Sequence, residues 1–179
     1  AEGQIIVGML AAAIVGVRGA GLPRIIHLPL TVLAGAAAGA VWAAVPGYLK
    51  AKLGVHEVVN SIMMNYIALF LSHYLVNGPI KDPNVAAPYS AEIADSSKLL
   101  RFFGDFHSEF RVNTGILVAI GAAVLIFYIL YKTTTGYEIR AVGANPDAAR
   151  YAGMNVPGAM VISMLLAGAM SGLAGAVQV

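Results

Sequence analysis

Residues 133–156 read TTTGYEIRAVGANPDAARYAGMNV and are the one long polar interruption between two strongly apolar runs in the C-terminal half of the chain. Residues 113–131, which include GILVAIGAAVLIFYILY, precede this segment, and residues 157–179 follow it. A helix that crosses a membrane needs about 20 largely apolar residues, and both flanking runs are close to that length. The pattern therefore predicts two membrane-spanning helices joined by a polar segment at the membrane surface, with a short capped helix inside it.

The composition indicates a membrane protein. Apolar residues make up 59% of the 179 residues and charged residues 11%, with a mean hydropathy of +0.77. A soluble domain carries about 25% charged residues, so this chain has too few charges to coat one. The formal net charge is only +2 and there is no basic run, so nothing indicates a nucleic-acid partner. The lack of cysteine in the sequence excludes disulfides, thiolate metal sites and cysteine nucleophiles.

Three more apolar runs are candidates for spanning helices. Residues 28–45 and 57–76 are long enough to cross a membrane, whereas residues 3–17 form a shorter, partial span. The Pro46-Gly47 pair is expected to end the run at 28–45. Residues 1–179 are thus predicted to form a single all-α domain, a polytopic transmembrane helix bundle. Because the chain opens and closes inside apolar runs and does not begin with Met, we expect it to be a fragment of a longer protein.

Small residues recur at helical spacing along these runs. The sets that share a helix face are Gly8, Ala12 and Gly16, then Gly35 and Gly39, and finally Gly168 and Gly172. Small residues let helix backbones approach closely within lipid. The pattern is widespread among membrane proteins, so it predicts a closely packed bundle and indicates nothing about a substrate.

The polar connections do not orient the chain in the membrane. If every long apolar run crosses, the connection at 77–112 and the segment at 133–156 lie on opposite sides. With 133–156 in the cytoplasm, five of the 11 Lys and Arg residues lie on the inner side and six on the outer side. The positive-inside rule requires a clear excess on one side, which these counts do not provide.

A short helix is expected to begin at Asn145. Its side chain is a good N-cap, Pro146 suits the first helical position, and Asp147 is favoured in the first turn by the helix dipole. Arg150 lies near the far end, and Gly153 is suited to end the helix in the left-handed conformation. A helix of about seven residues is marginal alone in water, so it needs a partner or the bundle to dock on. The alternative is an ordinary surface turn between the spans. Caps of this kind are common, so the spacing alone does not distinguish a docking helix from such a turn.

A second informative stretch, GVHEVVNSIMMNYI at 54–67, carries polar side chains on one face of an apolar helix. Glu57, Asn60 and Ser61 share that face, and Asn65 extends it by one turn. A polar stripe of this kind faces the bundle interior or a wet cavity, where Asn60, Ser61 and Asn65 would line a pathway for a polar, uncharged solute. The alternative is hydrogen bonding between helices without solute contact. Glu57 stands at the helix start, which favours a capping role over a proton relay.

Common enzyme motifs are missing from the sequence. It contains no P-loop of the form Gly-x-x-x-x-Gly-Lys-Ser/Thr, no His-Glu-x-x-His and no Gly-x-Ser-x-Gly. The chain is therefore not expected to bind ATP through a P-loop, and we predict neither catalytic residues nor a metal site in it.

The two informative stretches together resemble the permease subunits of ABC importers. GVHEVVNSIMMNYI is similar to the signature segment of permeases that work with a basic-membrane-protein type binding lipoprotein, in the nucleoside and simple-sugar branch. Residues 133–156 are similar to the cytoplasmic loop of the same permeases, a broader group that includes ribose-type and branched-chain amino acid permeases. The resemblance extends from about the second helix to the end of the chain. The matching loop positions are Gly136, Arg140, Ala141, Gly143, Asn145, Ala148, Ala149 and Gly153.

The resemblance implies a multi-pass subunit of an ATP-driven importer in the lipids of the cell membrane. It would translocate nucleosides or simple sugars, which an extracytoplasmic substrate-binding lipoprotein would deliver near residues 77–112. A partner ATPase subunit would bind ATP and Mg, and a second permease subunit would take part in the assembly. The coupling helix inside residues 133–156 would dock on the ATPase from the cytoplasm. Family members normally continue with further helices beyond both ends of this chain.

The residues expected to couple the chain to the ATPase are Arg140, Asn145, Pro146, Asp147, Ala149 and Arg150. The expected solute pathway includes Asn60, Ser61 and Asn65. Two alternatives remain open. A secondary transporter or channel that works without ATP would need an ionisable relay or a bound ion inside the membrane, for which only Glu57 is a candidate. The other alternative is a membrane scaffold that transports nothing.

Overall fold

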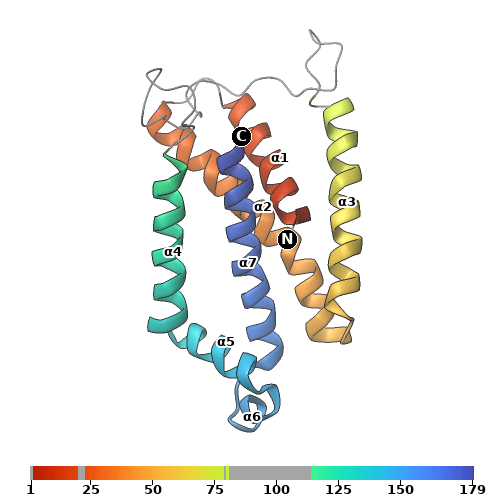
Figure 1. Cartoon of the computed structure of the whole chain (residues 1–179), viewed down its shortest axis with the longest axis vertical. Coiled ribbons are helices and arrows are strands. Elements are labelled where there is room, and N and C mark those ends of the chain that lie inside the picture. Colours follow the sequence, from red (N-terminus) through yellow and green to blue (C-terminus); the bar gives the residue numbers. More distant parts are fainter. Residues whose placement is uncertain (1, 20–22, 79, 81–113) are drawn as a thin grey trace.

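The computed structural model describes residues 2–19, 23–78, 80 and 114–179, and within them the chain forms seven α-helices and no strand (Figure 1). The helices are α1 (Glu2–Arg18), α2 (Arg24–Leu53), α3 (Glu57–Asn77), α4 (Gly115–Lys132), α5 (Thr134–Ala144), α6 (Pro146–Tyr151) and α7 (Val156–Gln178). The predicted all-α bundle is confirmed. Most of the predicted loop at 77–112 lies outside the described residues.

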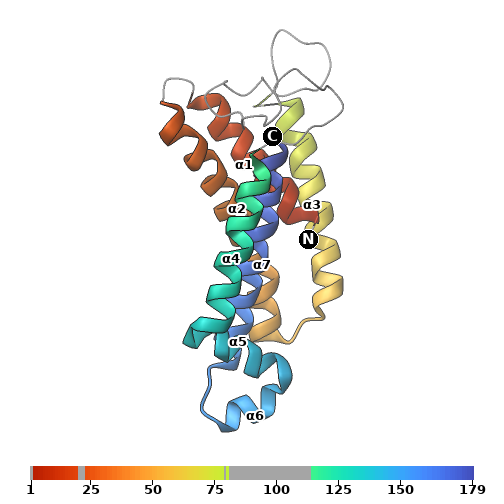
Figure 2. The ribbon, with the colours of Figure 1, turned by 60° about the vertical axis from the view of Figure 1, so that its left-hand side comes forward.

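Four of the described helices, α2, α3, α4 and α7, are long and apolar enough to span a membrane. They run along the long axis of the molecule, and the shorter α1 begins near mid-height of the bundle (Figure 1 and Figure 2). The first turn of α1 therefore lies level with the middle of the spanning helices. Glu2 belongs to this turn and is exposed in the described structure.

The centre of the bundle is built from small residues where α1, α2 and α7 meet. A Cβ added to Gly172 of α7 would lie 2.9 Å from Gly39 Cα and would also overlap the Gly35 carbonyl oxygen of α2. A Cβ added to Gly8 of α1 would lie 2.5 Å from Gly172 Cα. Both distances are too short for van der Waals contact, so glycine is what permits the three backbones to approach. The predicted close packing of the small-residue faces is confirmed.

Helix α2 is longer at both ends than the sequence predicted. It does not end at Pro46-Gly47 but continues to Leu53. Both residues are buried, and packed neighbours can sustain a helix through a proline. A Cβ added to Gly47 would lie 2.9 Å from Met164 Cβ, which shows how closely α7 approaches there. The helix ends instead at Gly54, which has a left-handed φ of 65° and donates its N–H to the Lys50 carbonyl.

The corner between α1 and α2 is held by a buried histidine. Helix α2 begins at Arg24 and therefore already includes His27. His27 is fully buried, and its Nε2 lies 3.1 Å from the Val15 carbonyl oxygen of α1. Thr31 donates its hydroxyl to the His27 carbonyl at 2.9 Å. These contacts satisfy polar groups that would otherwise be costly to bury.

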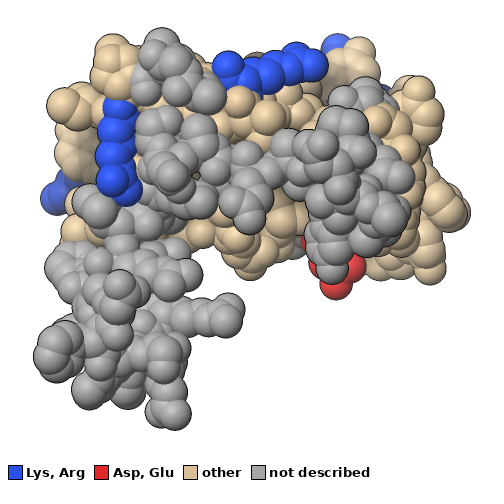
Figure 3. Space-filling view, turned by 90° about the horizontal axis from the view of Figure 1, so that it is seen from above, with Lys and Arg blue, Asp and Glu red and all other residues tan. Residues whose placement is uncertain are grey.

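The two ends of the bundle differ. Helices α5 and α6 lie at one end, and the Asn77 end of α3 and the Gly115 end of α4 lie at the other (Figure 1). Seen from this second end, basic side chains extend along the rim of the described surface (Figure 3). Positive charge is therefore not confined to the α5–α6 end, in agreement with the lack of charge bias between the loops.

Candidate functional site

Helix α5 leaves the end of α4 at a corner fixed by Thr133. The Thr133 hydroxyl donates to the Ile129 carbonyl at 2.6 Å and accepts from the Gly136 N–H at 3.1 Å, so it binds the end of α4 and caps α5. Gly136 is buried against α4, where an added Cβ would lie 2.5 Å from Leu130 Cα. The corner holds α5 across the end of the bundle (Figure 1). The sequence predicted one short helix between the spans, and α5 is a second one that it missed.

The short helix predicted to begin after Asn145 is present as α6. Asn145 has an extended backbone, and its Oδ1 accepts from the N–H groups of Asp147 and Ala148, each at 3.0 Å. Pro146 occupies the start of the helix, as predicted. Gly153 follows its end in the left-handed conformation, with a φ of 81°. The Asn145 cap, the proline at the start and the left-handed glycine after the end therefore bound a helix of six residues at the end of the bundle.

Helix α6 is attached to the bundle through Ala149. This side chain is only 4% exposed and joins Val142 of α5 with Val156 and Ala159 of α7 in one apolar cluster. Ala149 was predicted as a coupling residue, but the structure turns it toward the protein's own helices. Its side chain therefore packs inside the protein and supports α6 from within.

Asp147, Arg150 and Tyr151 form the outward side of α6, here called the α6 outer face. Residues advance by about 100° each around an α-helix, which places these three on one side and Ala149 opposite. All three are exposed, and Tyr151 is 94% exposed. Tyr151 was not among the predicted coupling residues. Its position in the sequence, as an aromatic residue at the end of a short polar helix, could have indicated a contact residue. An exposed aromatic beside an acid and an arginine is suited to binding a protein.

Arg140 braces the α4–α5 corner. Its guanidinium carbon lies 4.8 Å from the centre of the Tyr131 ring at the end of α4, and that ring stacks on Phe127 with centroids 4.9 Å apart. A cation–π contact at an exposed site contributes about 0.5–1 kcal/mol. The predicted coupling residues are thus divided between the corner, the start of α6 and its two sides.

A cavity of about 450 Å³ separates α5 and α6 from the adjacent ends of α2 and α3. One part of its wall is an ion pair in which Lys50 Nζ of α2 lies 2.6 Å from the Glu57 carboxylate of α3. Glu57 occupies the first turn of α3 as predicted, and its carboxylate also binds Lys50 across the turn, a partner that was not predicted. In the described part of the chain, α5 and α6 pack against α4 and α7 and against neither α2 nor α3. Because α6 itself packs on α5 and α7, a displacement of α6 would pass to these two helices first.

The predicted polar stripe of α3 faces the bundle. Asn60, Ser61 and Asn65 are half-buried, whereas Ile62 and Met63 between them are exposed. Asn65 Oδ1 accepts the Gly3 N–H of α1 at 2.8 Å, so this residue does bond a second helix. The amide nitrogen of Asn60 is buried and has no hydrogen-bond partner among the described residues.

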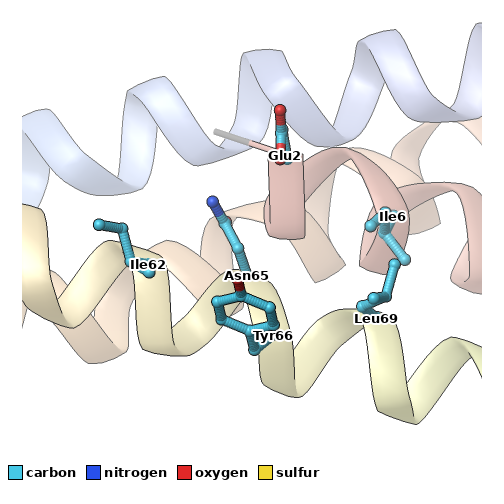
Figure 4. Close-up of a pocket in the computed structure, with 6 residues that line it drawn as sticks. All are labelled: Glu2, Ile6, Ile62, Asn65, Tyr66 and Leu69. Atoms are coloured by element: carbon cyan, nitrogen blue, oxygen red, sulfur yellow. The ribbon is translucent and has the colours of Figure 1, made fainter.

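A second cavity, of about 290 Å³, lies between α1 and α3 (Figure 4). The residues that line this α1–α3 cavity are Glu2, Ile6, Ile62, Asn65, Tyr66 and Leu69. In Figure 4, Ile6 and Leu69 close one end, and Asn65 reaches from α3 toward the first turn of α1. Of the three predicted pathway residues, Asn65 lines this cavity, while Asn60 and Ser61 lie nearer the start of α3.

Comparison with known protein families identifies the chain. Residues 1–179 match the family described as "Branched-chain amino acid transport system / permease component". The chain belongs to this permease family. The resemblance drawn from the two informative stretches is thereby confirmed. No solved structure matches the chain.

Several curated members of the permease family are similar along almost the whole chain. The guanosine ABC transporter permease protein NupP of Bacillus subtilis is 44% identical over 178 residues, which are 99% of this chain and 50% of that protein. The nucleoside ABC transporter permease protein NupB of Lactococcus lactis is 35% identical over 184 residues, with 98% and 50% covered. A glucose ABC transporter permease protein of Haloferax volcanii is 35% identical over 191 residues, with 100% and 48% covered. The chain spans about half the length of these relatives.

Membership of this permease family agrees with the structure. Among the described residues, four helices are able to span a membrane. The chain is therefore an integral, multi-pass protein of the cell membrane, as predicted.

Proposed function

We propose that the chain is part of the membrane-spanning permease of an ATP-driven importer for nucleosides, with simple sugars as the second solute class. The observation that carries this proposal is the 44% identity to a guanosine permease along 99% of the chain. The relatives named for nucleosides and for glucose support the same range of uncharged, hydroxylated solutes.

In this proposal, the α6 outer face docks on an ATPase subunit that binds ATP and Mg. Asn145 and Pro146 define the start of the helix, and Asp147 and Arg150 contact the ATPase together with Tyr151. The other two predicted coupling residues act indirectly, since Ala149 holds α6 on the bundle and Arg140 braces the corner at α4.

The packing gives a route by which movement of α6 reaches the solute pathway. Ala149 shares its apolar cluster with the first turns of α7. Farther along α7, Gly172 packs directly on α1 and α2. A tilt of α7 would therefore carry α1 with it, and α1 forms one wall of the α1–α3 cavity. This route supports an alternating-access mechanism in which ATP binding and hydrolysis tilt the helices around the solute.

The remaining partners follow from the two ends of the bundle. The Asn77 end of α3 lies at the opposite end from α6 (Figure 1), so if residues 133–156 are cytoplasmic, the connection that begins at Asn77 starts on the outer side. An extracytoplasmic substrate-binding lipoprotein would deliver the solute on the outer side. A second permease subunit would stand beside this one in the membrane.

Uptake by the complete transporter tests the proposal. Proteoliposomes that contain the full permease assembly and its ATPase are supplied with the binding lipoprotein and radiolabelled guanosine or glucose. We expect accumulation that requires ATP in the ATPase compartment. Uptake that continues without ATP and collapses with the ion gradient would support the secondary-transporter alternative instead.

A further inference from the structure

We infer that the α1–α3 cavity is the site of solute recognition, with Glu2 and Asn65 binding ring hydroxyls and Tyr66 covering a flat face of the solute. This inference rests on the proposed function and assigns residues to it. Glu2 and Tyr66 were not predicted as site residues, and the run at 3–17 that follows Glu2 was expected to be only a partial span.

The depth of Glu2 is the first argument. It belongs to the first turn of α1, which begins near mid-height of the bundle (Figure 1 and Figure 2). An ionisable side chain within the apolar zone of a membrane protein is costly and is by default a candidate for function. Among the described residues, Glu2 is also the only charged side chain that lines this cavity.

The orientation of the Asn65 amide is the second argument. Its Oδ1 is occupied by the Gly3 N–H at 2.8 Å. This bond fixes the side chain, so the amide nitrogen supplies hydrogen-bond donors, and Glu2, which lines the same cavity, supplies acceptors. Figure 4 shows Asn65 directed toward the first turn of α1. A preorganised donor beside a carboxylate can bind two neighbouring hydroxyl groups of one ring, because each hydroxyl both donates and accepts.

The apolar part of the cavity is the third argument. The Tyr66 ring is 58% exposed in the described structure, so its face is accessible to a ligand. Aromatic rings stack on nucleobases and on other flat apolar surfaces, and Ile62 and Leu69 extend the apolar wall. A volume of about 290 Å³ is close to the lower end of ligand-pocket sizes, roughly 300 Å³. The cavity therefore fits a small, neutral solute that carries a diol and a flat face.

The charge of Glu2 also predicts what the site rejects. A phosphorylated solute would bring negative charge toward the Glu2 carboxylate, and like charges repel. The site should therefore select nucleosides over nucleotides, and diols over deoxy analogues.

The test uses guanosine uptake by the complete transporter, with 2′-deoxyguanosine as the competing analogue. Removing a hydroxyl that bonds a charged group costs about tenfold in affinity, so the unmodified transporter should prefer guanosine by about that factor. Glu2→Gln keeps the shape of the side chain and should reduce the preference to about twofold or less.

Asn65→Ala and Tyr66→Leu should each raise the KM for guanosine by about tenfold. Tyr74→Leu is the matched control for Tyr66→Leu, because Tyr74 is an exposed tyrosine of α3 that does not line the cavity, and it should leave the KM unchanged. The amount of inserted protein normalises each rate.

Two outcomes overturn the inference in distinguishable ways. If the transporter imports guanosine with ATP and the cavity variants keep its KM and its preference for the diol, recognition occurs elsewhere and the proposed function stands. If the unmodified transporter imports neither guanosine nor glucose, the proposed function fails and the assignment of the cavity fails with it.

Discussion

Replacing Asn145 by Ala tests whether α6 acts as a stable docking element. The substitution removes an oxygen that accepts two backbone N–H groups, each at 3.0 Å. Loss of an N-cap of this kind costs about 1 kcal/mol, and α6 has only six residues over which to absorb it. Since about 1 kcal/mol corresponds to roughly a fivefold change in an equilibrium of folding, we expect about fivefold weaker binding of the ATPase subunit.

The assay is titration of the full permease in lipid nanodiscs with the purified ATPase, together with hydrogen exchange of the α6 amides. Asn155→Ala is the matched control, because Asn155 caps α7 by accepting the Gly158 N–H at 3.1 Å and α7 has 23 residues. It should leave the affinity for the ATPase unchanged, and Asn145→Ser should restore the affinity by restoring a cap. If Asn145→Ala speeds exchange in α6 without weakening ATPase binding, α6 is not the docking element.

Three further predictions concern packing, the α6 outer face and the ion pair. Gly172→Ala should destabilise the bundle by about 1–3 kcal/mol through overpacking against α2. Gly121→Ala should be neutral or stabilising, because the added Cβ has open space around it. Thermal unfolding in detergent compares the two variants, and equal melting temperatures would refute the packing account. Tyr151→Ala should leave the melting temperature unchanged, because the ring is 94% exposed. It should weaken ATPase binding by about tenfold, as the loss of an aromatic anchor from an interface does. Unchanged binding would show that Tyr151 is not part of the interface. Charge reversal at Lys50 or at Glu57 should lower the free energy of unfolding by at most about 1 kcal/mol, because both side chains are more than a third exposed. Reversing both charges together should restore the melting temperature. A double variant that melts no higher than the single variants would show that the pair does not contribute to stability.

The features that could be predicted from the sequence are those set by neighbouring residues. Asn145, Pro146 and Asp147 define the start of α6 through backbone bonds within a few positions, so the helix was predictable from their order. The spanning helices were predictable for the same reason, since the length of an apolar run decides them. The inward direction of Asn65 also followed from the spacing of the polar stripe.

The features that could not be predicted depend on contacts between distant segments. Pro46 was expected to end a helix by a local rule, but it is buried in the bundle and the helix continues through it. The partner of Glu57 is Lys50, which only the turn after α2 brings within reach. Glu2 forms part of a cavity only because α1 packs beside a helix some sixty residues later in the chain, as the hydrogen bond between Gly3 and Asn65 shows.

Site-specific photocrosslinking at position 151 tests the account most directly. A photoreactive amino acid replaces Tyr151 in the full transporter in native membranes, and the crosslinked product is identified by mass spectrometry. A second variant carries the probe at Asn77, which is exposed and lies at the opposite end of the bundle (Figure 1). We predict that the probe at 151 crosslinks to the ATPase subunit and the probe at 77 does not. Capture of the ATPase from position 77, or its failure to crosslink from position 151, would contradict the account.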